Sequence, residues 1–238
     1  MDVKEELGET EVASKNLNPH WFKTFTIEDY DPSISVAIAV NIFDKSRDGK
    51  KMGGTFFDLA TIAGRGAYDG AEEFEGFVGK KIRSGGTIYC RARQVYDAGK
   101  LVLMLRGLDL KNVEGFLKKS DPFYEISRRE GSHWDPVYRS EPVRNNLSPL
   151  WDEKKYDLSI LCDGDRDMPL RISVYDHESD GKHDFMGALQ TSVNELVAAK
   201  SFGGGGDAND VDSANHLLLV DNKQKVSGTL VVVNAHVI

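Results

Sequence analysis

Hydrophobic residues recur along much of the chain with the two-residue period of β-strands. Four segments alternate or run apolar at strand lengths and are bounded by Gly, Asp, Asn or Pro, namely residues 86–95, 100–108, 169–176 and 228–238. Helical periodicity is scarce, and only residues 57–64 and 192–200 can each form about two helical turns. The pattern predicts an all-β protein, built as an antiparallel sandwich with short helical connections.

The second half of the chain repeats the order of motifs found in the first half. Thr10-Glu11 and Asn16-Leu17-Asn18-Pro19-His20-Trp21 return as Ser140-Glu141 and Asn146-Leu147-Ser148-Pro149-Leu150-Trp151, an offset of 130. The later matches pair Phe43-Asp44 with Tyr175-Asp176, Met52-Gly53 with Met186-Gly187, and Gly86-Thr87 with Gly228-Thr229. Their offsets grow from 132 through 134 to 142, as loop insertions between duplicated domains would produce. The chain therefore contains an internal duplication.

The two copies differ in what precedes the repeated motifs. In the second copy 40 residues, Lys100 to Arg139, stand before Ser140, whereas only nine stand before Thr10. We therefore expect an incomplete domain over residues 1–96, which lacks its first strands, and a complete one over residues 97–238.

Composition excludes several classes of protein. The chain has 238 residues, 40% of them hydrophobic and 29% charged, with a formal net charge of −8. This acidic balance argues against nucleic acid as a partner, since affinity for phosphates requires many cations. No apolar run approaches the roughly 20 residues of a membrane span, and the acidic N-terminus is unlike a secretory signal. With only two cysteines, we expect reduced thiols and a soluble cytoplasmic protein.

Acidic residues gather in two loops of the second copy. One segment carries Asp109, Glu114 and Asp121, and the other, VYDHESDGKHDFMG, carries Asp176, Glu178, Asp180 and Asp184. Carboxylates from two loops repel one another unless a hard cation lies between them. Ca²⁺ takes six to eight oxygen ligands and tolerates irregular loops. A single acid in a loop is usually just solvated, but the grouping favours a Ca²⁺ site.

The ordered motifs SDPF (120–123), NNLSPLW (145–151) and VYDHESDGKHDFMG (174–187) resemble the hallmarks of a C2 domain, most closely the second C2 domain of copines. The resemblance covers about residues 100–238, and residues 1–96 resemble a copine first C2 domain from about its fourth strand onward. No segment similar to the copine von Willebrand A domain follows Ile238. The resemblance implies tandem C2-type antiparallel β-sandwiches, the first incomplete, whose loops bind Ca²⁺ and then an anionic phospholipid membrane.

The resemblance also implies the ligands. Asp121, Asp176 and Asp184 match the family's pattern, whereas Glu178 stands in place of an Asp and Asn112 aligns with the early acidic ligand of the first loop. Glu114 or Asp109 could compensate for Asn112. These departures leave weakened Ca²⁺ affinity open. In the first copy Asp44 is present, but Ser46 and Lys50-Lys51 replace the later acids, and we expect no Ca²⁺ site there.

Membrane contact is expected at the tip of the first acidic loop. Phe116 and Leu117 either enter the lipid interface or fold back onto the sandwich, and Lys118 and Lys119 would meet anionic headgroups. We expect a cytoplasmic, peripherally membrane-associated protein. The alternative is a calcium-independent C2 scaffold for protein partners. An enzyme is disfavoured, because His177 and His183 flank the acids without a nucleophile motif.

Overall fold

The computed structural model describes residues 5–31, 33–45, 49–63, 75–82, 86–93, 95–115, 118–202 and 215–238. The chain divides into two compact units, which we call unit 1 (1–12 and 24–96) and unit 2 (13–23 and 97–238). Residues 13–23 were expected in the first domain but lie with unit 2 instead. Among the described residues, no helix is both long enough and apolar enough to cross a bilayer.

Among its described residues, unit 1 contains two antiparallel strand pairs and a short helix. Its elements are β1 (Ala37–Asp44), β2 (Lys50–Asp58), α1 (Leu59–Ala63), β3 (Glu75–Lys81) and β4 (Thr87–Arg93). β1 pairs with β2, and β3 pairs with β4. Phe57, Ile62 and Ile88 form its small buried apolar cluster.

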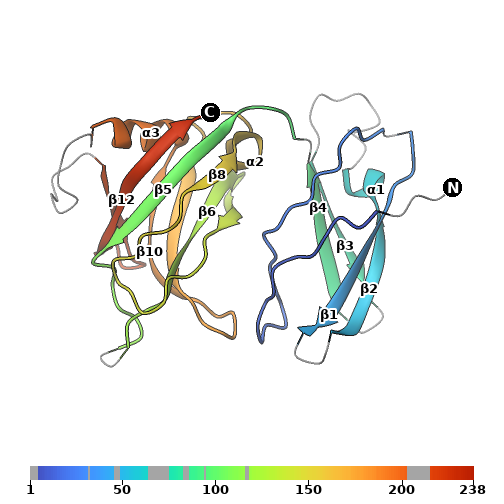
Figure 1. The fold of residues 1–238 in the computed structure, drawn as a ribbon, viewed down its shortest axis with the longest axis horizontal. Coiled ribbons are helices and arrows are strands. Elements are labelled where there is room, and N and C mark those ends of the chain that lie inside the picture. Colours follow the sequence, from blue (N-terminus) through green and yellow to red (C-terminus); the bar gives the residue numbers. More distant parts are fainter. Residues whose placement is uncertain are drawn as a thin grey trace. The chain divides into compact units, whose positions relative to one another are not determined.

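Unit 2 contains an eight-stranded antiparallel sheet (Figure 1). Its elements are β5 (Lys100–Leu108), β6 (Pro122–Glu130), β7 (His133–Arg139), β8 (Lys154–Asp157), α2 (Leu158–Cys162), β9 (Leu170–Asp176), β10 (Asp184–Thr191), α3 (Val193–Phe202), β11 (His216–Val220) and β12 (Val226–Val237). The strand order is β7-β6-β9-β10-β11-β12-β5-β8. β10 and β11 share a single paired position, Ala188 with Val220. The sheet bends there into two layers of four strands.

One apolar core fills the space between these layers. It takes Leu103 and Leu105 from β5, Ile126 from β6, and Ile172 and Val174 from β9, all fully buried. β6 is buried at seven consecutive positions, so both of its faces are covered, and α3 adds Val193, Leu196 and Ala199 to the core. The core holds the strand ends in place, so the loops that leave them start from fixed points.

Corresponding elements of the two units follow in the same order. β1, β2, α1, β3 and β4 of unit 1 correspond to β9, β10, α3, β11 and β12 of unit 2. The β1–β2 and β9–β10 hairpins both shift register at the repeated Met-Gly: Lys51 and Gly53 pair with consecutive residues across Met52, and Phe185 and Gly187 do so across Met186. β-bulges are specific features of a fold rather than defects, so a bulge at the same sequence position in both hairpins supports the duplication.

The predicted all-β fold is confirmed. The segments 86–95, 100–108 and 169–176 contain β4, β5 and β9, and 57–64 contains α1, whereas β12 begins two residues before 228–238 and α3 ends two residues after 192–200. The short helix α2 was not predicted. It begins after Asp157, whose carboxylate accepts a hydrogen bond from the Ser159 N–H at 3.0 Å, and ends at Asp163 in the left-handed conformation. A five-residue helix is too short to show a hydrophobic period.

Candidate metal centre

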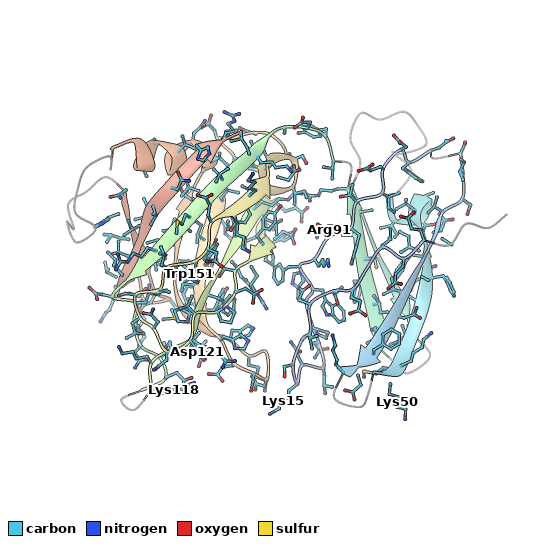
Figure 2. The ribbon with its side chains drawn as sticks, in the orientation of Figure 1. Lys15, Lys50, Arg91, Lys118, Asp121 and Trp151 are labelled. Atoms are coloured by element: carbon cyan, nitrogen blue, oxygen red, sulfur yellow. The ribbon has the colours of Figure 1, made fainter. Side chains whose placement is uncertain are left out.

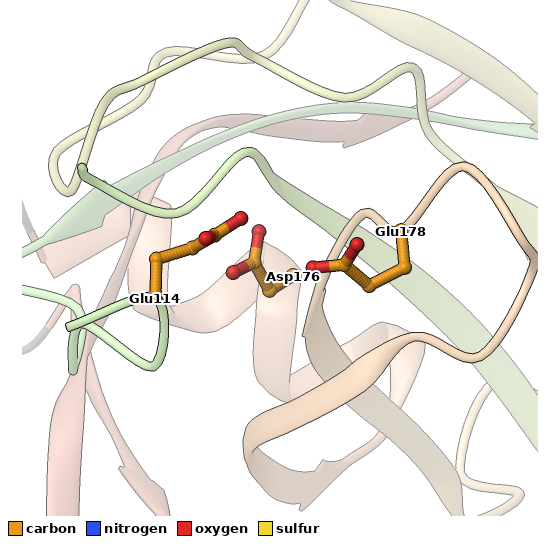
Figure 3. Close-up of side chains that lie close together, drawn as sticks. All are labelled: Glu114, Asp176 and Glu178. Atoms are coloured by element: carbon orange, nitrogen blue, oxygen red, sulfur yellow. The ribbon is translucent and has the colours of Figure 1, made fainter.

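Three carboxylates from two loops converge at one end of unit 2. Glu114 lies in the β5–β6 loop, Asp176 ends β9, and Glu178 follows it in the β9–β10 loop. One carboxylate oxygen from each lies within 4.8 Å of one from each of the others (Figure 3). We call these three residues the acidic cluster. An all-carboxylate donor set suits a hard cation such as Ca²⁺.

Asp176 is the buried member of the acidic cluster, with no exposed surface. Its Oδ1 accepts a hydrogen bond from the Asp121 N–H at 2.6 Å. Its Oδ2 is buried and has no hydrogen-bond partner in the described part of the chain. A buried carboxylate oxygen without a partner is destabilising unless a cation or a donor satisfies it. This atom therefore points to a cation held by the cluster.

Asp121 fastens the loops around the cluster rather than presenting both oxygens to it. Its Oδ1 accepts the Asn145 N–H at 2.6 Å, and its backbone carbonyl accepts the His177 N–H at 3.1 Å. With the bond from its own N–H to Asp176, Asp121 connects three loop segments. The motif that contains it, SDPF, runs into β6, and Pro122 suits the first strand position because it donates no ladder hydrogen bond.

Asn112, expected as a ligand by alignment, instead closes the β5–β6 loop on itself. Its amide group donates to the backbone oxygens of Gly115 at 2.5 Å and Lys118 at 2.9 Å. Its Oδ1 accepts both the N–H and the hydroxyl of Ser120 at 3.1 Å. The amide oxygen is therefore already used, and the structure brings Glu114 into the cluster where alignment had placed Asn112.

Asp184 lies beside the cluster without joining it. It is exposed and pairs across the hairpin with Asp176. Burial raises the pKa of Glu178, and the charges of Glu114, Asp176 and, less strongly, Asp184 raise it further. In unit 1 the position opposite Asp44 is Lys50. A cation therefore stands in the unit 1 hairpin where unit 2 has a carboxylate.

The lysines of the loop tip have different surroundings. The Lys118 ammonium contacts Glu114 Oε1 at 2.5 Å, and Figure 2 shows Lys118 and Asp121 at the same end of unit 2. The Lys119 side chain is exposed, and its backbone N–H donates to Asn145 Oδ1 at 3.0 Å. Phe116 and Leu117 lie outside the described residues, so their expected membrane contact stays a prediction.

A histidine holds Glu178 in place, a role that the sequence did not reveal. The Nδ1 of His183 accepts the Glu178 N–H at 3.0 Å. The imidazole and the Phe123 ring are T-shaped, with centroids 4.8 Å apart, and the Arg139 guanidinium lies 4.9 Å from the Phe123 centroid. The only sequence signal was a histidine in the same acidic loop, which indicates neither its partner nor its neutral state.

Lowering the pH should destabilise unit 2 through His183. Burial lowers the pKa of His183 to about 4, and the charges of Arg139 and His177 lower it further against the opposing charge of Asp180. An unfolded histidine, near 6.5, binds a proton that the folded one does not. Stability is therefore lost as the pH falls from about 6.5 toward 4. Discounted for partial exposure, the loss is about 1–2 kcal/mol.

Urea unfolding in chelator, followed at pH 7.5 and pH 5, measures this loss. All three tryptophans, Trp21, Trp134 and Trp151, belong to unit 2, so their fluorescence reports on that unit. His183→Gln should flatten the pH dependence, whereas His133→Gln, at an exposed site in the β6–β7 hairpin, should not. Carboxylates with a raised pKa, such as Glu178, take up protons more readily in the folded state and so stabilise it as the pH falls. This opposite effect is present in the wild type and in both variants. Equal pH dependence in wild type and His183→Gln would contradict the assignment.

Comparison with known proteins identifies the family. A C2 domain family model matches residues 1–74 and 101–204. A solved structure described as BON1-C2B is 23% identical and covers 60% of this chain and 94% of its own, with a TM-score of 0.49. The C2 domain designated A of plant Extended Synaptotagmin 1 is 23% identical over 58% of this chain and 92% of its own, with a TM-score of 0.39. The calcium-bound pair of C2 domains, A and B, of Extended-Synaptotagmin 2 is 22% identical over 58% of this chain and 47% of its own, with a TM-score of 0.32. The two segments matched by the family model span well over half of the sequence, and the chain belongs to the C2 domain family.

Proposed function

We propose that this chain binds anionic phospholipid membranes in response to Ca²⁺, through the loops at one end of unit 2. The observation that carries the proposal is the fully buried Asp176, whose Oδ2 has no hydrogen-bond partner among the described residues. It lies between two further carboxylates, Glu114 and Glu178. C2 domains generally serve membrane and Ca²⁺ binding, which agrees with this donor set.

The acidic cluster would hold the ion, with Asp121 and Asp184 as neighbouring charges. Three carboxylates do not fill the six to eight positions that Ca²⁺ takes, so lipid phosphate oxygens can complete its coordination. Without an ion, the cluster repels phosphate. A bound divalent cation reverses the local potential, so the ion acts both as a switch and as a bridge.

The finer parts of the proposal follow the sequence resemblance. We propose a copine-like, non-catalytic protein that associates peripherally with membranes from the cytoplasm. Lys119 and the loop segment with Phe116 and Leu117 would contact headgroups and the lipid interface. A calcium-independent scaffold remains the second candidate, and the contact of Lys118 with Glu114 favours it, because an internal cation already balances part of the cluster.

Co-sedimentation with vesicles separates the two candidates. Phosphatidylserine-containing vesicles should pellet the full chain in Ca²⁺ and leave most of it in the supernatant in chelator. Neutral phosphatidylcholine vesicles should pellet little protein in either condition, since the bridge requires an anionic headgroup. Pelleting that is identical in Ca²⁺ and in chelator would contradict Ca²⁺ dependence and support the scaffold.

A further inference from the structure

Lys118 is held at the acidic cluster by the backbone of its own loop. Asn112 donates to the Lys118 carbonyl and to the Gly115 carbonyl, so the backbone at both of these residues is tied to one side chain. Asn112 in turn is fixed by the buried Ser120. The Lys118 backbone is therefore anchored beside the cluster, and its ammonium lies against Glu114.

The charge of Lys118 is stabilised by more than its direct partner. The hydrogen bond to Glu114 raises the pKa of Lys118, and the charges of Glu114, Asp121 and Asp176 raise it further. The ammonium thus lies in the field of the same carboxylates that would hold a metal ion. It does not satisfy all of them, because the buried Oδ2 of Asp176 has no partner among the residues described.

We propose that Lys118 is a tethered cation that competes with the divalent ion, and that it must leave Glu114 before all three carboxylates can bind metal. This inference rests on the proposed Ca²⁺ site and adds its regulation. Two cations cannot share the Glu114 oxygen at contact distance without strong repulsion. All three carboxylates can bind metal only in the molecules in which Lys118 has left Glu114. The apparent association constant for metal is therefore the intrinsic constant multiplied by the fraction of such molecules.

The size of this competition is limited by exposure. The Lys118 side chain is 54% exposed, whereas that of Glu114 is 19% exposed. Solvent screens such a pair, so releasing the lysine changes an equilibrium by only about three- to tenfold. Lys118 therefore sets the Ca²⁺ concentration at which the site fills, rather than blocking it. Once displaced, its ammonium is available to a lipid phosphate beside the ion.

Calorimetric Ca²⁺ titration of the full chain tests the inference, with Lys118→Met compared with Lys119→Met. Both variants remove one positive charge from the same loop and keep an unbranched side chain, but only Lys118 contacts Glu114. We expect Lys118→Met to bind Ca²⁺ about three- to tenfold more tightly than wild type. Lys119→Met should remain within about twofold, since an exposed charge in salt solution is largely screened.

The outcomes separate the inference from the proposed function. If wild type binds Ca²⁺ and Lys118→Met binds no more tightly than Lys119→Met, the tethered cation is wrong and the site stands. If only Lys118→Met binds, the tethered cation is supported and Ca²⁺ dependence of the native chain is wrong. If neither binds, both are wrong.

Thermal unfolding supplies a second readout. In chelator, Lys118→Met should be less stable than Lys119→Met, because the cluster has lost its counter-charge. In saturating Ca²⁺ the difference should vanish or reverse. A difference of the same sign and size in both conditions would overturn the competition.

Discussion

Asp176→Asn should lose Ca²⁺ binding while making unit 2 more stable in chelator. In the wild type, a fully buried carboxylate presents Oδ2 to the cluster without a partner in the described structure. Removing its charge from between Glu114 and Glu178 should weaken Ca²⁺ binding at least about 100-fold, roughly 3 kcal/mol, the scale of deleting one partner of a buried charge pair. Such a loss is the expected sign of a central ligand.

The gain in metal-free stability has a separate physical cause. Asparagine keeps the Oδ1 that accepts the Asp121 N–H, and its amide group can donate to a neighbouring carboxylate. The buried charge and its desolvation disappear, so the free energy of unfolding in chelator should rise by about 1–2 kcal/mol. Opposite changes in binding and stability are typical of residues retained for function.

Calorimetry and urea unfolding measure the two effects, with Asp180→Asn as the matched control. Asp180 lies in the same loop, is exposed, and accepts the Lys182 N–H at 2.9 Å, so its replacement should change Ca²⁺ affinity by less than about twofold. Asp184→Asn should fall between the two variants, because Asp184 is exposed beside the cluster. Wild-type affinity in Asp176→Asn would disprove the site.

The fold could be predicted from the sequence where burial follows the strand period. β5 and β12 alternate or run apolar and were located within a few residues. β6 and β7 were not, because their sequences carry charges and a proline. Arg139 pairs with Glu125 across the two strands, and Pro136 of the edge strand β7 lies at its register shift. Such pairing is satisfied only after the strands meet, so no local pattern predicts it.

The sequence predicted which acidic residues gather at the candidate site, but not which of the neighbouring side chains contact one another. The acids at 176 and 178 are close in sequence, so their proximity follows from one strand end. The sequence left open whether Asn112 or Glu114 faces the ion, since that depends on hydrogen bonds from Asn112 to the loop backbone. Lys118 was expected to face lipid, yet its ammonium lies on Glu114. Both depend on side-chain contacts between residues three to eight apart within one loop, which a hydrophobic period does not indicate.

Trp151→Ala should remove much of the stability of unit 2. The tryptophan is 3% exposed, its ring is T-shaped to that of Tyr124 with centroids 5.1 Å apart, and its Nε1 donates to the Pro122 carbonyl at 3.3 Å. Truncating such a side chain leaves a core cavity and costs about 3–5 kcal/mol. Natural domains have only about 5–15 kcal/mol in total. The melting temperature of the unit should fall by roughly 10 °C.

The repeat supplies the matched control for this variant. Trp21 occupies the equivalent sequence position but is only half-buried. Trp21→Ala should therefore cost about 1 kcal/mol or less by urea unfolding monitored by circular dichroism. Because Trp151 also holds Pro122, next to Asp121, its loss should weaken Ca²⁺ binding in the fraction that remains folded. Equal destabilisation by the two substitutions would mean that the repeat alone, and not burial in the sandwich, determines what each tryptophan contributes.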